Sequence, residues 1–162
     1  MQTYYLSLNG YRKLRQRRKE IAASIEAKKK QMGESVSIDN DLRENPEFMQ
    51  LRTDVTYVLP RRLNEIDIVL SSCQIIEDLA DFINSKFDKV QLGAKVTVKY
   101  EDGTVVPFII LGYNETDIDT DVISYLSPTA QGLLGKSAGE TVEIKVPERT
   151  IKIKILSVEK GI

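Results

Sequence analysis

Apolar residues recur with a helical period in the first half of the chain and with an alternating period in the second. Over residues 8–33 one narrow apolar stripe consists of Tyr11, Leu14, Ile21, Ile25 and Met32. Such a stripe is typical of a coiled-coil seam rather than of a broad globular face. Asn9 is expected to cap the start of this helix, and Gly33 is a residue type at which helices commonly end.

A second helix is predicted to begin at Asn45, which suits the N-cap, with Pro46 in the first helical position. Its apolar seam shifts by one residue at Pro60, and a proline inside a helix removes a backbone hydrogen bond. We therefore expect a kink or a single π-type bulge near residues 56–61, with the helix ending near Leu79. Two such helices joined by a short loop form an antiparallel coiled-coil hairpin, too thin to be a compact domain.

From about residue 90 the chain predicts a small, mostly antiparallel sheet with one short helix. The alternating or apolar segments are AKVTVKY (94–100), VVPFIIL (105–111), TVEIKV (141–146) and RTIKIKIL (149–156). The sequence EDG between the first two suits a hairpin turn. Ser127 as cap, Pro128 in the first position and Gly135 as stop predict the short helix. The predicted fold class is therefore α+β, with a hairpin over residues 1–79 and a sheet domain over residues 80–162.

Composition excludes several classes of function. The chain has no histidine and one cysteine, Cys73, so Ser-His and Cys-His nucleophile systems, histidine metal sites and intrachain disulfides are excluded. No apolar run approaches the length of a membrane span and the N-terminus has no signal-peptide pattern. We expect a cytoplasmic protein that does not associate with membranes.

Charge is segregated along the predicted hairpin. Residues 10–30 contain nine basic and two acidic residues, whereas residues 31–79 contain four basic and ten acidic residues. The simpler interpretation is that the two helices attract each other along their length. A basic face on the first helix that meets nucleic acid or an acidic protein is the second interpretation.

The predicted end of the hairpin carries an excess of carboxylates. Asp41 and Glu44 are three residues apart, and a solvated turn beside a helix cap is the plain interpretation of that spacing. Carboxylates at the end of a long hairpin could also supply hard oxygen ligands to a Mg²⁺ ion elsewhere. Two carboxylates do not complete a coordination shell, so a partner would supply the rest of such a site.

Four motifs, in order along nearly the whole chain, resemble the Gre family of bacterial transcript cleavage factors, and GreA more than GreB. The tip sequence DLRENPEF resembles the family's D-L-S/K-E-N-A-E-Y. The segment ISYLSPTAQGLLGKSAGETVEI resembles its C-terminal signature. The segments LSLNGYRKLRQRRKEI and LSSCQIIE resemble the opening of its first helix and the close of its second.

The resemblance implies a coiled-coil hairpin followed by an FKBP-like sheet domain, in an accessory factor rather than an enzyme. In this family the sheet domain docks on bacterial RNA polymerase, and the hairpin enters the secondary channel. The tip acids help to hold the second Mg²⁺ and its water, and the polymerase then cleaves backtracked RNA near its 3′ end. Mg²⁺ is accordingly expected only within the polymerase complex, and the free protein is expected to be a monomer.

Motif by motif, the resemblance assigns roles to eight residues, and the basic face of the first helix adds Arg15 and Arg18 as candidate contacts. Asp41 and Glu44 are the metal-assisting acids. Contacts with RNA or polymerase are implied for Asn45, Phe48, Arg52, Arg15, Arg18, Ser124, Ser127 and Pro128.

Departures from the family pattern keep two further functions open. Asn40 stands where a glycine is usual, Asp39 is an additional acid, Phe48 replaces a tyrosine, and Leu126 replaces a polar residue. A protein of the same fold that occupies the channel without promoting cleavage is the first alternative. A structural or chaperone-like module is the second, and neither fold nor sequence implies prolyl isomerase activity.

Overall fold

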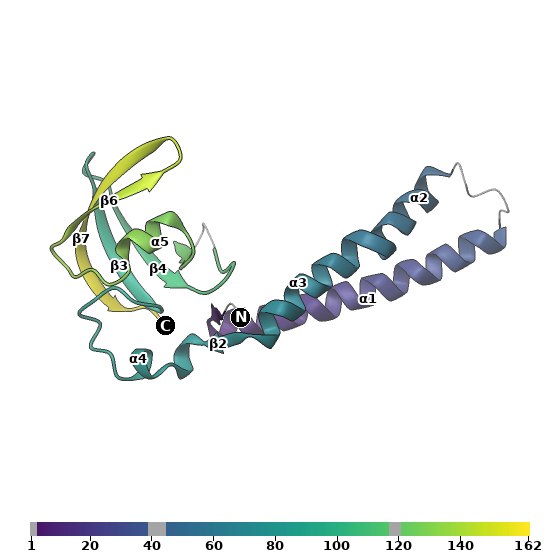
Figure 1. Ribbon diagram of the computed structural model, residues 1–162, viewed down its shortest axis with the longest axis horizontal. Coiled ribbons are helices and arrows are strands. Elements are labelled where there is room, and N and C mark those ends of the chain that lie inside the picture. The colour runs from purple at the N-terminus through teal and green to yellow at the C-terminus, as the bar shows by residue number, and fades with distance from the viewer. Residues whose placement is uncertain (1–2, 39–44, 117–120) are drawn as a thin grey trace. The chain divides into compact units, whose positions relative to one another are not determined.

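The computed structural model describes residues 3–38, 45–116 and 121–162 of the chain, and it has the predicted α+β fold (Figure 1). Contacts divide the chain into two compact units. One is Arg12–Ser72, and the other combines Met1–Tyr11 with Cys73–Ile162. None of the helices in these described ranges is long and apolar enough to cross a membrane.

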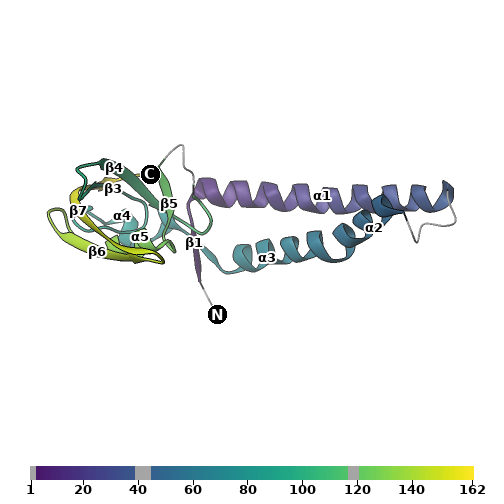
Figure 2. The ribbon, with the colours of Figure 1, turned by 90° about the horizontal axis from the view of Figure 1, so that it is seen from above.

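The unit Arg12–Ser72 is a helical hairpin. Its elements are α1 (Leu8–Ile38, which begins in the other unit), α2 (Pro46–Thr53), the π-helix η2 (Asp54–Val58) and α3 (Leu59–Ser71). Side-chain contacts join Gln31 to Glu47, Lys28 to Asp54 and Arg18 to Asp67. Residue numbers fall on one arm as they rise on the other, so the arms are antiparallel, as predicted (Figure 2).

The predicted irregularity in the second arm is present as η2, at Asp54–Val58. It begins two residues before the expected segment and lies directly ahead of Pro60, which is in the first turn of α3. A π-helix takes up one extra residue without ending the helix. The apolar side chains of Leu51 and Val69, on either side of it, are therefore both buried.

The helix boundaries predicted from sequence are correct at one end and wrong at three. Asn45 caps α2 as predicted, since its Oδ1 accepts hydrogen bonds from the backbone N–H groups of Glu47 and Phe48. Ser7, not Asn9, caps α1, because Ser7 Oγ accepts from the N–H of Gly10. Gly33 does not end α1, which continues to Ile38.

The second arm also ends earlier than predicted, at Ser71 instead of near Leu79. Residues Cys73–Ile75 form strand β2, which pairs in parallel with β1 (Tyr4–Leu6). Parallel pairing of a chain start with a segment 69 positions later leaves no local sequence pattern, and the sequence did not predict it. A 3₁₀ turn (Ile76–Asp78) and a short helix, α4 (Ala80–Ile83), follow.

A five-stranded sheet forms the core of the other unit. Its strand order is β5-β4-β3-β7-β6, and all neighbours are antiparallel except β4 and β5. The strands are β3 (Ala94–Tyr100), β4 (Val105–Leu111), β5 (Val122–Ser124), β6 (Thr141–Val146) and β7 (Arg149–Lys160). The four strands predicted from sequence are confirmed, and β5 was not predicted.

The sheet curls around one short helix, α5 (Pro128–Leu133), which contacts β6 (Figure 1). Ser127 Oγ caps this helix through the N–H of Ala130, and Gly135 follows it at a φ of 80°, as predicted. The buried core beneath includes Val96, Val98, Ile110, Leu133, Ile144 and Ile155. Burial of these side chains supplies most of the stability of this unit.

Candidate functional site at the end of the hairpin

The candidate acids lie between the two arms of the hairpin in sequence. Residues 39–44 connect Ile38, the last residue of α1, to Asn45, the cap of α2. Asp41 and Glu44 are within this connection and outside the described residues. The structure describes the two helix ends on either side of these acids, at Ile38 and at Asn45.

Asn45 and the residues after it fix where α2 starts. Asn45 has an extended backbone conformation, and its side-chain oxygen lies 3.0 Å from Glu47 N and 3.2 Å from Phe48 N. Pro46 needs no N–H partner in the first turn. Glu47 also accepts a weak hydrogen bond from Gln31 of α1, at 3.4 Å. This end of α2 is therefore defined both locally and across the hairpin.

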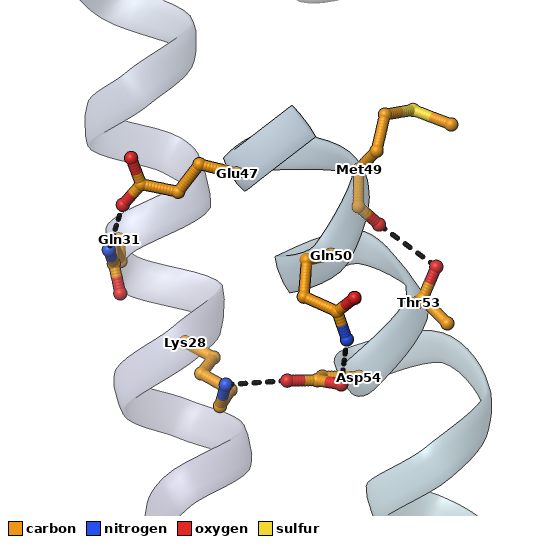
Figure 3. A network of polar contacts seen from close by, with 7 residues as sticks. All are labelled: Lys28, Gln31, Glu47, Met49, Gln50, Thr53 and Asp54. Carbon is orange, nitrogen blue, oxygen red and sulfur yellow. Dashed lines mark hydrogen bonds and ion pairs between the residues drawn. The ribbon is translucent and has the colours of Figure 1, made fainter. Parts of the chain in front are cut away.

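One turn further from the end, a charged network joins the arms (Figure 3). Lys28 Nζ of α1 lies 2.6 Å from Asp54 Oδ2, and Gln50 Nε2 donates to the other oxygen of Asp54 at 2.9 Å. The hydrogen bond from Lys28, followed by the one from Gln50, holds the pKa of the Asp54 carboxyl below its usual value. Asp54 thus remains ionised and paired at neutral pH.

The predicted contact residues of the hairpin differ in their solvent exposure and in the ion pairs that they form. Phe48 is half-buried, whereas Arg52 is exposed and forms no ion pair with any described residue. Arg15 is also exposed. Arg18 is engaged, since both its Nε and one terminal nitrogen bond the carboxylate of Asp67, and this raises the pKa of Arg18. Arg52 is therefore more available than Arg18 for an anionic partner.

The first helix displays further cations on its outer face. Within the described part of the chain no ion pair is formed by Arg12, Lys13, Arg17 and Lys19. Lys28, Lys29 and Lys30 are paired with Asp54, Glu26 and Glu34. Pairing between the arms, the simpler interpretation of the charge segregation, therefore accounts for Arg18 and Lys28 but not for this outer group.

Three of the predicted contact residues lie in the sheet unit and hold the turn between β5 and α5. Ser124 is buried, and its Oγ accepts a hydrogen bond from Leu126 N at 3.3 Å. Ser127 caps α5 and Pro128 is its first residue. Leu126 projects from this turn with 45% of its surface exposed. The serines therefore shape a turn that presents Leu126.

The described residues do not by themselves form a metal site. Among them, no group of three or more Asp, Glu, Cys or His side chains could hold a metal ion. A polar site that the sequence did not predict is the Glu115 carboxylate, which binds the start of α1 through Ser7. In the sequence, the one indication of this site is that Glu115 is an acid shortly after the apolar strand β4.

Comparison with known proteins points to one family. The family model described as "Transcription elongation factor, GreA/GreB, C-term" matches residues 84–160. The chain is 30% identical over 160 residues to a transcription elongation factor GreA from Clostridium acetobutylicum, covering 96% of each chain. It is 32% identical to that of Psychromonas ingrahamii, covering 98% of each. A solved structure of the transcription factor Gfh1 matches with 19% identity and a TM-score of 0.45, covering 98% of each chain.

Proposed function

Because the chain belongs to the GreA/GreB family of transcription elongation factors, we propose that it binds bacterial RNA polymerase and stimulates its cleavage of backtracked RNA. In this proposal the hairpin enters the secondary channel and reaches the 3′ end of the nascent RNA. The protein is an accessory factor, so the polymerase performs the hydrolysis. We further propose that it acts as a cytoplasmic monomer.

The observation that carries the proposal is the sequence DLREN, placed directly before a capped helix in a helical hairpin. Asn45 starts α2 immediately after Glu44, and α1 continues to Ile38 on the other side. Asp41 and Glu44 are therefore tied to the ends of two helices over a six-residue connection. That arrangement supports delivery of two carboxylates to a site outside the protein.

The donor set fits the proposed metal. Two carboxylates are the hard oxygen donors that Mg²⁺ takes, and they are too few for a full shell, so the polymerase must supply the other ligands. When bound between the two proteins, the ion would activate water for attack on the RNA phosphodiester. The chain's own part is to hold Asp41 and Glu44 in place, through the Asn45 cap and the Lys28–Asp54 contact between the arms.

The test is a cleavage assay on purified, stalled and backtracked bacterial RNA polymerase with Mg²⁺. The protein should release 3′ RNA fragments, and Asp41→Asn and Glu44→Gln should each abolish release while still binding polymerase. Glu47→Gln makes the same change of charge three residues beyond Glu44 and should retain activity. Absence of fragments at concentrations where binding is demonstrated contradicts the proposal.

A second candidate is occupancy of the channel without cleavage. Leu126 favours it, because an exposed leucine stands in the turn before α5 where the family pattern has a polar residue. A changed contact at this turn would alter the affinity for polymerase and the position of the hairpin in the channel. In the same assay, slowed nucleotide addition without fragment release supports this candidate over the first.

A further inference from the structure

The outward face of the five-stranded sheet is basic, and no helix among the described residues of its own unit covers it. Strand β3 alternates between buried residues, such as Val96 and Val98, and outward residues, and β6 and β7 do the same. The core and α5 lie against the inward side. The exposed lysines of the outward positions are Lys95, Lys99, Lys145, Lys152 and Lys154. We refer to these five residues as the lysine face.

The strand register places two of these lysines directly opposite each other. Lys99 of β3 pairs with Lys154 of β7, so their side chains leave the same side of the sheet. Paired residues on adjacent strands have Cβ atoms about 5 Å apart. Like charges in this arrangement are destabilising. Folding alone therefore gives no reason for this pair.

Acidic residues on the same face leave most of this charge uncompensated. Glu143 pairs with Lys152, with 3.3 Å between their charged atoms, and Glu159 lies opposite Lys95 in the register. None of the described carboxylates forms an ion pair with Lys99, Lys145 or Lys154. The five lysines and two glutamates of these strands leave a surplus of three positive charges.

The neighbouring outward residues are small hydroxyls on β3, β6 and β7 and apolar residues on β4, and Leu156, the extra residue of β7 at the register shift, is 42% exposed. In the register, Thr141 lies opposite Lys154, Thr150 opposite Lys145, and Thr97 opposite Ser157. Outward positions of β4 opposite β3 are Val105, Pro107 and Ile109. Hydroxyls and lysines contact phosphate oxygens, whereas binding of single strands relies on stacking of bases on aromatic side chains. The described outward positions of these four strands offer no aromatic side chain.

We propose that the lysine face binds the phosphate backbone of a nucleic-acid duplex without reading its sequence. Residues two apart on a strand are separated by about 7 Å and adjacent strands by about 5 Å, so the cations form a grid that can meet several phosphates. Threonine and serine hydroxyls between them can donate to the same phosphates. This face belongs to the sheet unit, and the inference does not depend on cleavage activity.

The direct test uses the full chain, without polymerase, and a fluorescein-labelled DNA duplex of random sequence. Fluorescence anisotropy gives the binding constant as KCl is raised from about 50 to about 200 mM, where each neutralised phosphate contributes a slope close to one. Lys99→Gln with Lys154→Gln should reduce the slope of log K against log salt by about two. Lys86→Gln, an exposed lysine outside the sheet, is the charge-matched control and should change it by far less.

A second measurement separates binding from a structural role. Lys99→Glu replaces a repelling pair with an attracting one, so it should raise the thermal midpoint while it weakens duplex binding by about tenfold or more. A merely structural lysine would show a lowered midpoint. The proposal is overturned if the double variant and Lys86→Gln have the same salt slope, or if polyglutamate displaces the duplex as well as an unlabelled duplex does at equal charge.

Discussion

Lys28 Nζ of α1 lies 2.6 Å from Asp54 Oδ2, at the first residue of the π-helix in the opposite arm. Both side chains are only partly exposed, at 30% and 20%. An ion pair in the seam of a helical hairpin fixes which residues face each other, because a shifted register leaves both charges without partners. The pair therefore holds the arms in register beside the irregularity.

Breaking this pair should destabilise the hairpin more than breaking an exposed pair on one helix. We predict that Lys28→Ala or Asp54→Ala lowers the thermal midpoint of the helical circular dichroism signal. The double variant should be less destabilised than the sum of the two, since the partners are in direct contact. Lys29→Ala removes only the exposed Glu26 pair and is the control. Additive effects would show that Lys28 and Asp54 do not interact.

The same pair predicts a pH dependence. The folded-state pKa of Asp54 lies below its ordinary value of 3.8, so its stabilising contribution is present above that value and is lost as the pH falls through the folded pKa. The difference in thermal midpoint between the wild-type protein and Asp54→Asn should be constant near neutral pH and shrink in strongly acidic buffer. A difference that persists below the folded pKa would contradict the assignment.

Local features of the sequence predicted the local features of the fold. Asn45 and Ser127 satisfy backbone groups within three residues of themselves, so their caps were predictable. The one-residue shift of the apolar seam at Pro60 likewise predicted the π-helix. Gly33 was misjudged because it does not adopt the positive φ of a glycine that ends a helix, and one glycine inside a helix costs only about 1 kcal/mol.

The cap of α2 offers a separate test of the hairpin end. Asn45→Ala removes the acceptor for two backbone N–H groups and should cost about 1 kcal/mol of unfolding free energy. Asn45→Asp retains the acceptor and should be close to the wild-type protein. Urea denaturation followed by circular dichroism measures both. Equal losses in the two variants would mean that the cap is not the stabilising feature.

The start of α1 depends on Glu115, which the sequence did not single out. Its carboxylate accepts from Ser7 N at 2.8 Å and from Gly112 N at 2.9 Å, and Ser7 is 3% exposed. Glu115→Ala leaves these donors unsatisfied and should cost about 2 kcal/mol, measured by urea denaturation. Glu115→Gln keeps one acceptor oxygen and should cost less.

A glycine next to this carboxylate provides an independent check. A Cβ atom at Gly10 would overlap the Glu115 carboxylate. Gly10→Ala should therefore destabilise the wild-type protein and be far better tolerated in the Glu115→Ala background. Equal effects in both backgrounds would show that Glu115 does not occupy this position in solution.

Long-range relationships explain what the sequence did not predict. Ser7 and Glu115 are 108 positions apart in sequence. Strand β1 pairs with β2, although the whole hairpin lies between them in sequence. A single sequence has no periodicity that links such segments. The contact role of Arg18 was predicted from the basic face of the first helix, whereas its pairing with Asp67 depends on the register of the two arms. Asp41 and Glu44 remain predictions from the motif, because they lie outside the described residues.

The most direct test of the central claim is the Mg²⁺ dependence of the single-turnover rate of RNA cleavage in backtracked polymerase. If Asp41 and Glu44 help to hold the ion, the wild-type protein should lower the Mg²⁺ concentration needed for half-maximal rate. Asp41→Asn and Glu44→Gln should each return it to the value for polymerase without the factor, because each removes a charged metal ligand. An unchanged Mg²⁺ dependence in both variants, with polymerase binding intact, would contradict the account.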